Sequence, residues 1–268
     1  MRFSRLVLLS IVVGVAAACE SDKVTTPSTP PHSDLRFISA VADTGAVDIR
    51  FVDQVDLSPF ANTLAFRGSS FTGYQPAEAK ARHIKVFPTS LNIAITQQVL
   101  LDTTITIPEG QRITLLLTGP SRTAGQLKFV MINDDVTAPP AGQIGIRVVN
   151  ASTGAVSGYL VNAVGDALPG TATFANVASY TATPYTTRAT GNAALRFTDV
   201  GSATVNASVA GPATPAAIVG ALPAAGLQSS GTVFSVYYFP KARAGSVSTP
   251  GAVWFVDRNP CDGPCTSN

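Results

Sequence analysis

The chain has 268 residues, of which 46% are hydrophobic and only 13% are charged, with a formal net charge of +2. This charged fraction is about half of the ~25% that is usual for soluble proteins. The sequence contains no run of basic residues, which excludes a nucleic-acid-binding protein, because such binding needs several phosphate contacts from clustered Lys and Arg. The hydrophobic fraction is sufficient for a core, and the length allows one or two domains.

The first 18 residues have the pattern of a secretory signal peptide. Arg2 and Arg5 give a positive start, residues 6–15 are apolar, and the small residues 16–18 precede Cys19. This apolar run is too short for a membrane-spanning helix, which needs about 20 residues. The segment resembles the signal of bacterial lipoproteins, whose cysteine is acylated and becomes the first mature residue. We therefore expect residues 1–18 to be removed and Cys19 to carry lipid; the alternative is an ordinary secreted protein with Cys19 as a free thiol.

Residues 19–34 are expected to form an extended tether, because they contain three prolines and no apolar periodicity. Glu20 stands where enteric lipoproteins retained in the inner membrane carry Asp, so an outer-membrane or cell-surface location in the bacterial envelope is favoured. Loss of Arg2 and Arg5 with the signal leaves 16 Lys+Arg against 16 Asp+Glu, so the mature chain is formally neutral.

After the tether the chain repeats itself. Residues 35–40 read LRFISA and residues 146–151 read IRVVNA, and each is followed closely by TGAV, at 44–47 and at 153–156. The ends of the two copies also match in character, KFVMIND at 128–134 and VWFVDR at 253–258. A period of about 110 residues is too long for a solenoid repeat and is the size of a small β-sandwich domain.

Strand signals recur within each copy. Residues 103–107 and 112–117 alternate or are β-rich around Pro108-Glu109-Gly110 and predict a hairpin. The segments 204–209 and 232–239 have strand patterns as well. The Ala-rich span 213–225 is predicted to be a loop, because Pro and Gly interrupt it. We predict an all-β protein with two tandem antiparallel β-sandwiches, at 35–135 and 143–258, joined by a linker at 136–142.

The two openings resemble those of a bacterial domain-of-unknown-function family, whose tandem domains begin with sequences of the type VRFVNAS…AVDV. The resemblance covers about residues 35–258. It implies an Ig-like sandwich fold and a place on secreted or lipid-anchored surface proteins. It implies no activity, and therefore no catalytic residue.

The C-terminal tail, residues 259–268, contains the two remaining cysteines. Cys261 and Cys265 flank an Asp-Gly-Pro turn, and we expect them to form a disulfide in an oxidising compartment. Free thiols and a metal pair are the alternatives. A structural zinc site needs four ligands, and no histidine lies nearby.

The ionisable residues give no catalytic pattern. His32 falls in the tether, and alternation predicts that His83 is exposed opposite Ile84. The adjacent pair Asp134-Asp135 precedes the linker, where solvated carboxylates are expected. A further group of acids could ligate calcium, but its spacing matches no calcium loop and solvated loop positions are favoured; these are Asp43, Asp48, Asp53 and Asp56. We expect no catalytic residue, metal or cofactor.

Three tyrosines are candidates for stacking on a sugar or peptide: Tyr74, Tyr185 and Tyr238. The alternative, which we favour, is that their rings pack in the core. The leading functional hypothesis is a non-catalytic, lipid-anchored envelope protein that displays two β-sandwich modules for adhesion or scaffolding. The second is a carbohydrate- or peptide-binding surface module, and the third is a hydrolase. The expected partners are the membrane, through the lipid, and an unidentified protein or glycan.

Overall fold

The structure is a computed structural model that describes residues 29–55, 58–71, 73–134, 137–212, 226–242 and 249–260. The chain divides into two compact units, residues 1–31 and 32–268, and the description below concerns the second. Several predictions fall outside the described residues: the signal peptide, Cys19, the loop 213–225, and the pair Cys261 and Cys265. Within the described ranges, no helix is long and apolar enough to cross a bilayer.

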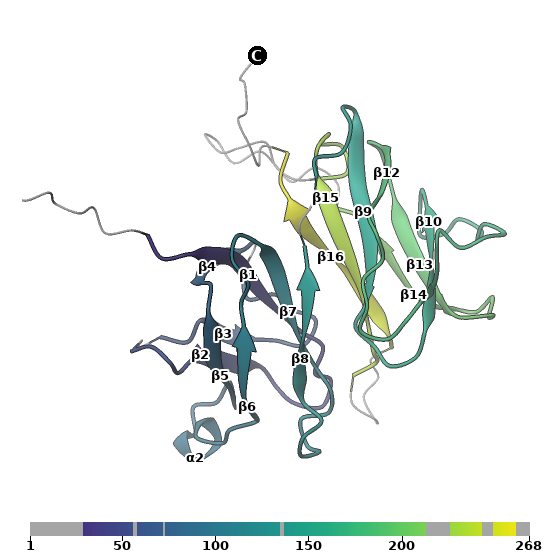
Figure 1. Ribbon diagram of the computed structural model, residues 1–268. Coiled ribbons are helices and arrows are strands. Elements are labelled where there is room, and N and C mark those ends of the chain that lie inside the picture. Colours follow the sequence, from purple (N-terminus) through teal and green to yellow (C-terminus); the bar gives the residue numbers. More distant parts are fainter. Residues whose placement is uncertain are drawn as a thin grey trace, which may run out of the picture. The chain divides into compact units, whose positions relative to one another are not determined.

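The prediction of an all-β fold with two sandwich halves is confirmed (Figure 1). The first half contains β1 (His32–Ser39), β2 (Val47–Phe51), β3 (Ala61–Leu64), β4 (Gln75–Glu78), β5 (Ala81–Pro88), α2 (Ile93–Thr96), β6 (Leu101–Thr106), β7 (Arg112–Thr118) and β8 (Lys128–Asn133). The second half contains β9 (Gln143–Asn150), β10 (Val156–Val161), β11 (Phe174–Val177), β12 (Thr186–Ala189), β13 (Ala194–Asp199), β14 (Val205–Ala210), β15 (Val233–Phe239) and β16 (Gly251–Arg258).

The two halves have the same topology. The first has sheets ordered β4-β1-β7-β8 and β3-β2-β5-β6, and the second has β12-β9-β15-β16 and β11-β10-β13-β14. Each strand of the second half therefore takes the place of the strand eight positions earlier in the first. We call β4-β1-β7-β8 and β12-β9-β15-β16 the inner sheets, because they face each other, and the remaining two the outer sheets.

The central strands of the inner sheets are buried on both faces. Residues 113–118 of β7 and all of β15 are buried, and both strands are near-continuous apolar runs, as expected for strands covered on both sides. In each inner sheet the first strand pairs with the seventh in parallel, β1 with β7 and β9 with β15. The sequence-based prediction of antiparallel sandwiches did not include these two parallel strand pairs.

Two local expectations need correction. The predicted hairpin of 103–107 and 112–117 is wrong, because β6 pairs with β5 in the outer sheet while β7 pairs with β1 and β8 in the inner sheet. The turn at 108–110 therefore crosses between sheets. Residues 32–34, predicted to belong to the tether, instead begin β1, in which His32 lies opposite Glu78 of β4.

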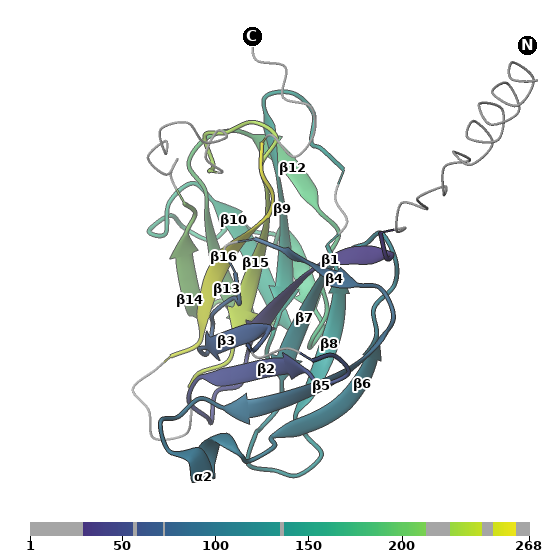
Figure 2. The same cartoon turned by 90° about the vertical axis from the view of Figure 1, so that its left-hand side faces the viewer.

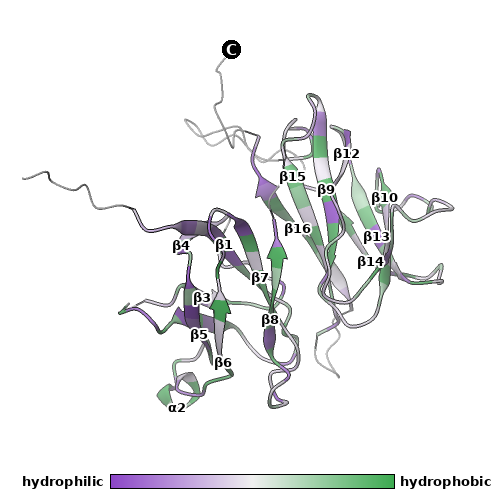
Figure 3. Cartoon of the chain, in the orientation of Figure 1, coloured by the Kyte–Doolittle hydropathy of each residue, from purple (hydrophilic) through white to green (hydrophobic). Residues whose placement is uncertain are grey.

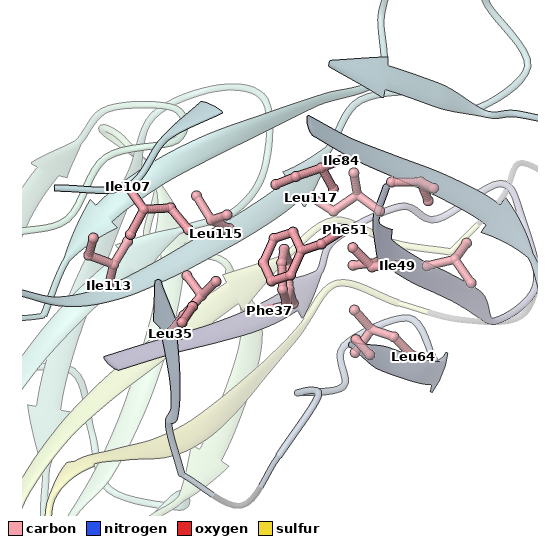
Figure 4. Close-up of a cluster of buried hydrophobic side chains, with 14 of the residues drawn as sticks. Leu35, Phe37, Ile49, Phe51, Leu64, Ile84, Ile107, Ile113, Leu115 and Leu117 are labelled. Carbon is pink, nitrogen blue, oxygen red and sulfur yellow. The ribbon is translucent and has the colours of Figure 1, made fainter. Parts of the chain in front are cut away.

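Each half encloses its own apolar core. In the first half, Phe37 and Leu115 of the inner sheet pack against Ile49 and Ile84 of the outer sheet, and all four are fully buried (Figure 4). In the second half, Val148 and Val236 occupy the corresponding places, in the same cluster as Phe197 of the outer sheet. Burial of such a side chain contributes about 1.5–3 kcal/mol, so these clusters hold the inner sheet of each half to its outer sheet.

A third apolar cluster lies between the halves. It contains Ile38 and Leu116 from the first inner sheet and Val149, Tyr237 and Phe239 from the second, all at 0% exposure. Side chains alternate along a strand, so Leu115 and Leu117 face the first core while Leu116 faces this third cluster. We call the contact between the two inner sheets the joint.

The repeated TGAV segments serve the fold of each half. The next residue, Asp48 or Ser157, lies in a bulge of β2 or β10. The Asp48 carboxylate accepts a hydrogen bond from the Thr63 amide at 2.8 Å, and the Ser157 hydroxyl accepts one from the Asn176 amide at 3.4 Å. Thr63 and Asn176 have φ angles of 52° and 51°, so the two different side chains support the same left-handed turn.

Candidate functional site

The arginines of the two repeated openings meet in the joint. Arg36 on β1 is 1% exposed and donates three hydrogen bonds. Its Nε bonds to Thr114 Oγ1 at 2.8 Å, its Nη1 to the Val256 carbonyl at 2.9 Å, and its Nη2 to Asp257 Oδ1 at 2.5 Å. The last two partners belong to the second half, so Arg36 connects the two inner sheets.

Arg147 on β9 makes the mirror set of contacts. Its Nε bonds to Ser235 Oγ at 2.7 Å, its Nη1 to the Asn133 carbonyl at 2.8 Å, and its Nη2 to Asp134 Oδ1. Asn133 and Asp134 end the first half where Val256 and Asp257 end the second. The joint is therefore self-complementary, as in a two-fold symmetric dimer interface, although both halves belong to one chain.

Two tyrosines complete this arrangement. The Arg36 guanidinium lies 4.5 Å from the ring centroid of Tyr74, and that of Arg147 lies 4.4 Å from the centroid of Tyr185. The Tyr74 hydroxyl donates to Asp134 at 2.9 Å, and the Tyr185 hydroxyl donates to Asp257 at 2.9 Å. We call this set the joint cluster: Arg36, Arg147, Asp134, Asp257, Tyr74 and Tyr185.

Burial and charge set the protonation states in the joint cluster. Burial raises the pKa of Asp134, and the Arg36 charge opposes that rise only in part. Burial alone would lower the pKa of Arg36, but the surrounding charges, of which that of Asp257 is the strongest, together outweigh burial and raise that pKa well above its ordinary value. Burial, followed by the charge of Asp257, raises the pKa values of Tyr74 and Tyr185. The tyrosine hydroxyls therefore stay protonated and act as donors.

The joint cluster has a structural role. Its two arginines balance its two aspartates, and Asp134 receives hydrogen bonds from Tyr74, Thr114 and Arg147. A carboxylate that only accepts is in the form suited to these partners. Buried charges are tolerated when they are paired and hydrogen-bonded. The cluster therefore holds the halves together and offers no free acid, base or nucleophile.

The structure corrects the tyrosine candidates. Tyr238 is 4% exposed and packs in the second core, so its ring cannot stack on a ligand. Tyr74 and Tyr185 are occupied by the joint cluster, with one ring face covered by a guanidinium. The favoured alternative, packing in the core, therefore holds for Tyr238, whereas Tyr74 and Tyr185 are partly exposed and pack against the arginines of the joint.

Asp134 also departs from expectation. We expected a solvated carboxylate before the linker, but Asp134 is 0% exposed. Sequence reasoning did not assign it to a site. The available signal was the repeat itself, since both openings contain one Arg and both ends contain one Asp within apolar runs. An arginine and an aspartate that recur at equivalent positions in both copies indicate that the two charges pair.

The other acids are used separately and do not converge. Asp43 accepts from the Ser121 amide at 2.9 Å, Asp48 accepts from Thr63, and Asp53 pairs with Arg82 at 2.8 Å. Asp56 lies outside the described residues. Over the described ranges, no group of three or more His, Cys, Asp or Glu is placed to hold a metal ion.

His83 is partly exposed, with 43% of its side chain accessible, and Ile84 beside it is buried. Its Nε2 lies 2.5 Å from Asp102 Oδ1, and Lys85 also contacts Asp102, at 3.0 Å. The hydrogen bond from His83 and that from Lys85 lower the pKa of Asp102. These contacts lie on the surface of the outer sheet, and Asp102 is already engaged by both His83 and Lys85.

A small groove opens at the end of the joint remote from His32. Its volume is about 180 Å³, below the 300–1,000 Å³ that is usual for small-molecule pockets. Residues of both halves line it, including Ala40, Pro120, Ala151, Tyr180 and Pro240. The ring of Tyr180 is partly exposed, and the Lys128 ammonium lies 5.5 Å from its centroid. The groove can accept a small apolar group against an aromatic ring.

The groove marks a place where the halves differ. Arg67 and Tyr180 hold corresponding positions, since their amides donate to the equivalent carbonyls of Ser39 and Asn150 and both have left-handed φ angles, 62° and 59°. Arg67 extends across the joint and donates to the Pro240 carbonyl at 2.9 Å. Tyr180 therefore stands where the first half has a cross-joint arginine.

Comparison with curated proteins gives no match. Among solved structures, the chain is similar to CBMbc (family CBM26) from Eubacterium rectale Amy13K in complex with maltoheptaose, at 12% identity, covering 84% of this chain and 95% of that one with a TM-score of 0.23. A likeness at that TM-score carries no argument about fold or ligand.

Residues 33–159 match the family described as "Domain of unknown function (DUF4397)". The matched segment contains the first half, β9 and the start of β10, and so includes the openings of both copies. This match to a domain-of-unknown-function family agrees with the resemblance seen in the repeated openings.

Proposed function

We propose that this protein is a non-catalytic, lipid-anchored protein of the bacterial envelope that displays its two sandwiches to a partner. The observation that carries the proposal is the joint cluster. The buried ionisable groups of the repeated motifs are used to fix one half against the other, with their donors and acceptors paired inside the protein. The residues that recur in both copies therefore join the two halves into one unit, and we propose that this unit binds a partner.

The anchor is part of this proposal. Cys19 follows a signal-like segment, and the fold begins at His32, so an acyl group on Cys19 would attach to the end of the first half where β1 starts. Each buried methylene of an acyl chain adds about 0.8 kcal/mol of membrane affinity, and stable anchoring takes more than one chain. The other end of the first half, where β1 ends, would then point either away from the membrane or back toward it.

The experiment that tests the proposal is intact-mass analysis and fractionation of the full chain. We expect a mature product that starts at Cys19, carries acyl chains and sediments with membranes. The Cys19→Ser variant is expected to be released into the soluble fraction or to accumulate as precursor. An unacylated wild-type product in the soluble fraction would overturn the placement.

The display role is tested by cross-linking on intact cells followed by mass spectrometry. We expect cross-links from loop residues to another envelope component. Turnover of an ester, peptide or glycan by the purified protein would contradict the non-catalytic role, provided that the activity is lost with a substitution in this chain.

A carbohydrate- or peptide-binding function is the second candidate, and the groove beside Tyr180 favours it. A partly exposed ring flanked by a cation is a surface on which a sugar or a peptide side chain can stack. We expect Tyr180→Ala to abolish retention on cell-wall or glycan fractions, and Tyr159→Ala on the outer sheet to leave it unchanged. Equal retention of both variants, or no retention of the wild type on any fraction, would remove this candidate.

A further inference from the structure

The loop between β5 and β6 exposes an unusual number of large aliphatic side chains. Leu91 is 108% exposed, Ile93 70%, Ile95 40% and Val99 47%, and none of the residues of α2 is buried. Figure 3 shows α2 as a hydrophobic segment at the edge of the first half. Isolated exposed apolar residues are common, but several together indicate an interaction site. We call residues 89–100 the α2 loop.

The fold does not need a loop of this size. The α2 loop contains twelve residues between Pro88 and Leu101, whereas the corresponding connection of the second half, between Asp199 and Val205, contains five. Both connect equivalent strands of an outer sheet. The additional length and its apolar residues therefore serve something other than chain connection.

The α2 loop is free of charge. No Asp, Glu, Lys or Arg occurs from Val86 to Leu101, and the flanking Lys85 and Asp102 pair with each other at 3.0 Å. Charged groups are costly to transfer into hydrocarbon, and this segment has none to transfer. An uncharged segment is compatible with an apolar medium, and it has no electrostatic attraction to a charged surface.

Several backbone amides of the α2 loop are hydrogen-bonded within the loop. The amides of Ile95 and Thr96 donate to the Asn92 carbonyl at 3.0 and 3.1 Å, and that of Gln97 donates to Ile93 at 3.1 Å. The Ala94 amide donates to the Asn92 side chain at 3.0 Å. An unpaired amide costs several kcal/mol in hydrocarbon, so this hydrogen bonding suits a segment that leaves water.

We propose that the α2 loop inserts its aliphatic side chains into the surface of a lipid bilayer. Leu91 and Ile93 extend furthest from the protein, at 108% and 70% exposure, and the half-covered Ile95 and Val99 lie in the same loop. A fluid medium accommodates such a tip without a shaped pocket. Because no cation takes part, the binding is expected to be independent of anionic lipid and insensitive to salt.

The chain length before the fold allows the loop and the anchor to enter the same bilayer, and this step alone rests on the proposed acylation. β1 starts at His32 and its eight residues span about 26 Å. The next strand after β1 is β2, which begins at Val47, and Val47 lies opposite Pro88 at the end of β5. The α2 loop follows Pro88 and therefore lies near the C-terminal end of β1, away from His32, as Figures 1 and 2 show. The 13 residues from Cys19 to His32 can extend at most about 45 Å, which is enough to return to the membrane.

The experiment places a tryptophan in the loop of the processed full chain. Leu91→Trp is made on a fully exposed side chain, and Val164→Trp, in a loop that contains Asp166, is the matched control. Each variant is mixed with neutral phosphatidylcholine vesicles whose acyl chains are brominated, and the wild-type signal of Trp254 is subtracted. We expect several-fold stronger quenching for Leu91→Trp than for Val164→Trp, unchanged at high salt.

A second measurement uses the Cys19→Ser background, in which no acyl chain contributes. There, Leu91→Ser combined with Ile93→Ser is expected to lower the vesicle partition coefficient at least about tenfold, because each exposed aliphatic side chain contributes about that factor on burial. The matched control is Val164→Ser combined with Val200→Ser, two exposed valines of the second half.

The outcomes separate the loop from the anchor. A chain that floats with vesicles while Leu91→Trp is not quenched would overturn the loop proposal and leave the anchor standing. Quenching of Leu91→Trp in a processed chain that retains Cys19 but carries no acyl group would support the loop and refute the anchor. A dimer in solution that is lost in the Leu91→Ser, Ile93→Ser variant, with no vesicle binding, would assign the loop to a second copy of the chain and overturn the proposal.

Discussion

Replacing Arg36 by methionine tests whether the joint cluster holds the two halves together. Arg36→Met keeps most of the side-chain volume but removes three hydrogen bonds, to Thr114, to the Val256 carbonyl and to Asp257. Asp257 is 2% exposed, so its charge would remain buried without its main cation. Removal of one partner of a buried ion pair costs about 3–5 kcal/mol. For a domain of this size we expect the melting temperature to fall by roughly 6–20 °C.

The assay is urea and thermal unfolding followed by circular dichroism, with Arg122→Met as the control. Arg122 is exposed, and its replacement is expected to cost less than about 1 kcal/mol. Arg147→Met makes a second comparison, because the mirror contacts of Arg147 predict a loss similar to that of Arg36→Met. Adding Asp257→Leu to Arg36→Met should recover part of the loss, since a buried pair replaced by apolar groups is often neutral.

Two results would refute this reasoning. One is a cost for Arg36→Met no greater than that of Arg122→Met, which would mean that the cluster is not buried between the halves in solution. The other is a large cost for Arg36→Met together with a negligible cost for Arg147→Met, which would contradict the two-fold equivalence of their contacts.

Three further predictions concern packing, backbone and pH. Leu116→Ala and Leu117→Ala should each lower the free energy of unfolding by about 2–5 kcal/mol, because Leu116 faces the joint and Leu117 the first core; a negligible effect at Leu116 alone would show that the joint opens in solution. Gly119→Ala should cost more than about 1 kcal/mol in chemical denaturation, because Gly119 has a φ of 100° and an added Cβ would lie 2.1 Å from the Gln126 carbonyl oxygen, whereas Gly45→Ala meets no atom within 4 Å and should be neutral or slightly stabilising; equal effects would argue against this turn geometry. Burial raises the pKa of Asp43, but hydrogen bonds from the Ser121 and Arg122 amides outweigh it and lower that pKa below 3.8; its stabilising contribution is therefore present above pH 3.8 and lost as pH falls through the lowered value, so unfolding measured down the acid range should be less steep in Asp43→Asn, and an unchanged slope would contradict the assignment.

The fold class could be predicted from the sequence because its signals are local or repeated. Apolar runs such as residues 113–117 and 232–239 indicate buried strands, and the recurrence of the openings indicates two copies. The hairpin prediction failed for a physical reason. A turn between two strand-like segments specifies where the chain bends, but it does not specify which neighbour the second strand bonds to. Here β7 pairs in parallel with β1, which starts about 80 residues earlier, and no short-range pattern encodes that choice.

The site predictions failed where burial decides the outcome. Tyr74 and Tyr185 have neighbours with no strong apolar pattern, so sequence alone left stacking on a ligand and packing inside the protein as alternatives. Their partners, Arg36 and Arg147, stand more than 35 residues away along the chain. Asp134 precedes a linker-like segment and has the surroundings of a solvent-exposed acid. Only contact with the other half makes it a buried ion.

In a tandem duplication, a residue repeats in both copies when it serves each half alone or when it serves a symmetric contact between them. Asp48 and Ser157 belong to the first class, because they support equivalent turns, and Arg36 and Arg147 belong to the second. Neither class indicates a ligand, so the residues that recur in both copies of this chain indicate the fold of each half and the contact between the halves. Contact with other molecules is then expected where the copies differ. Tyr180 in place of Arg67 leaves a groove at the joint, and twelve residues in place of five form the α2 loop. Each of the two binding proposals made for this protein rests on one of these departures from symmetry.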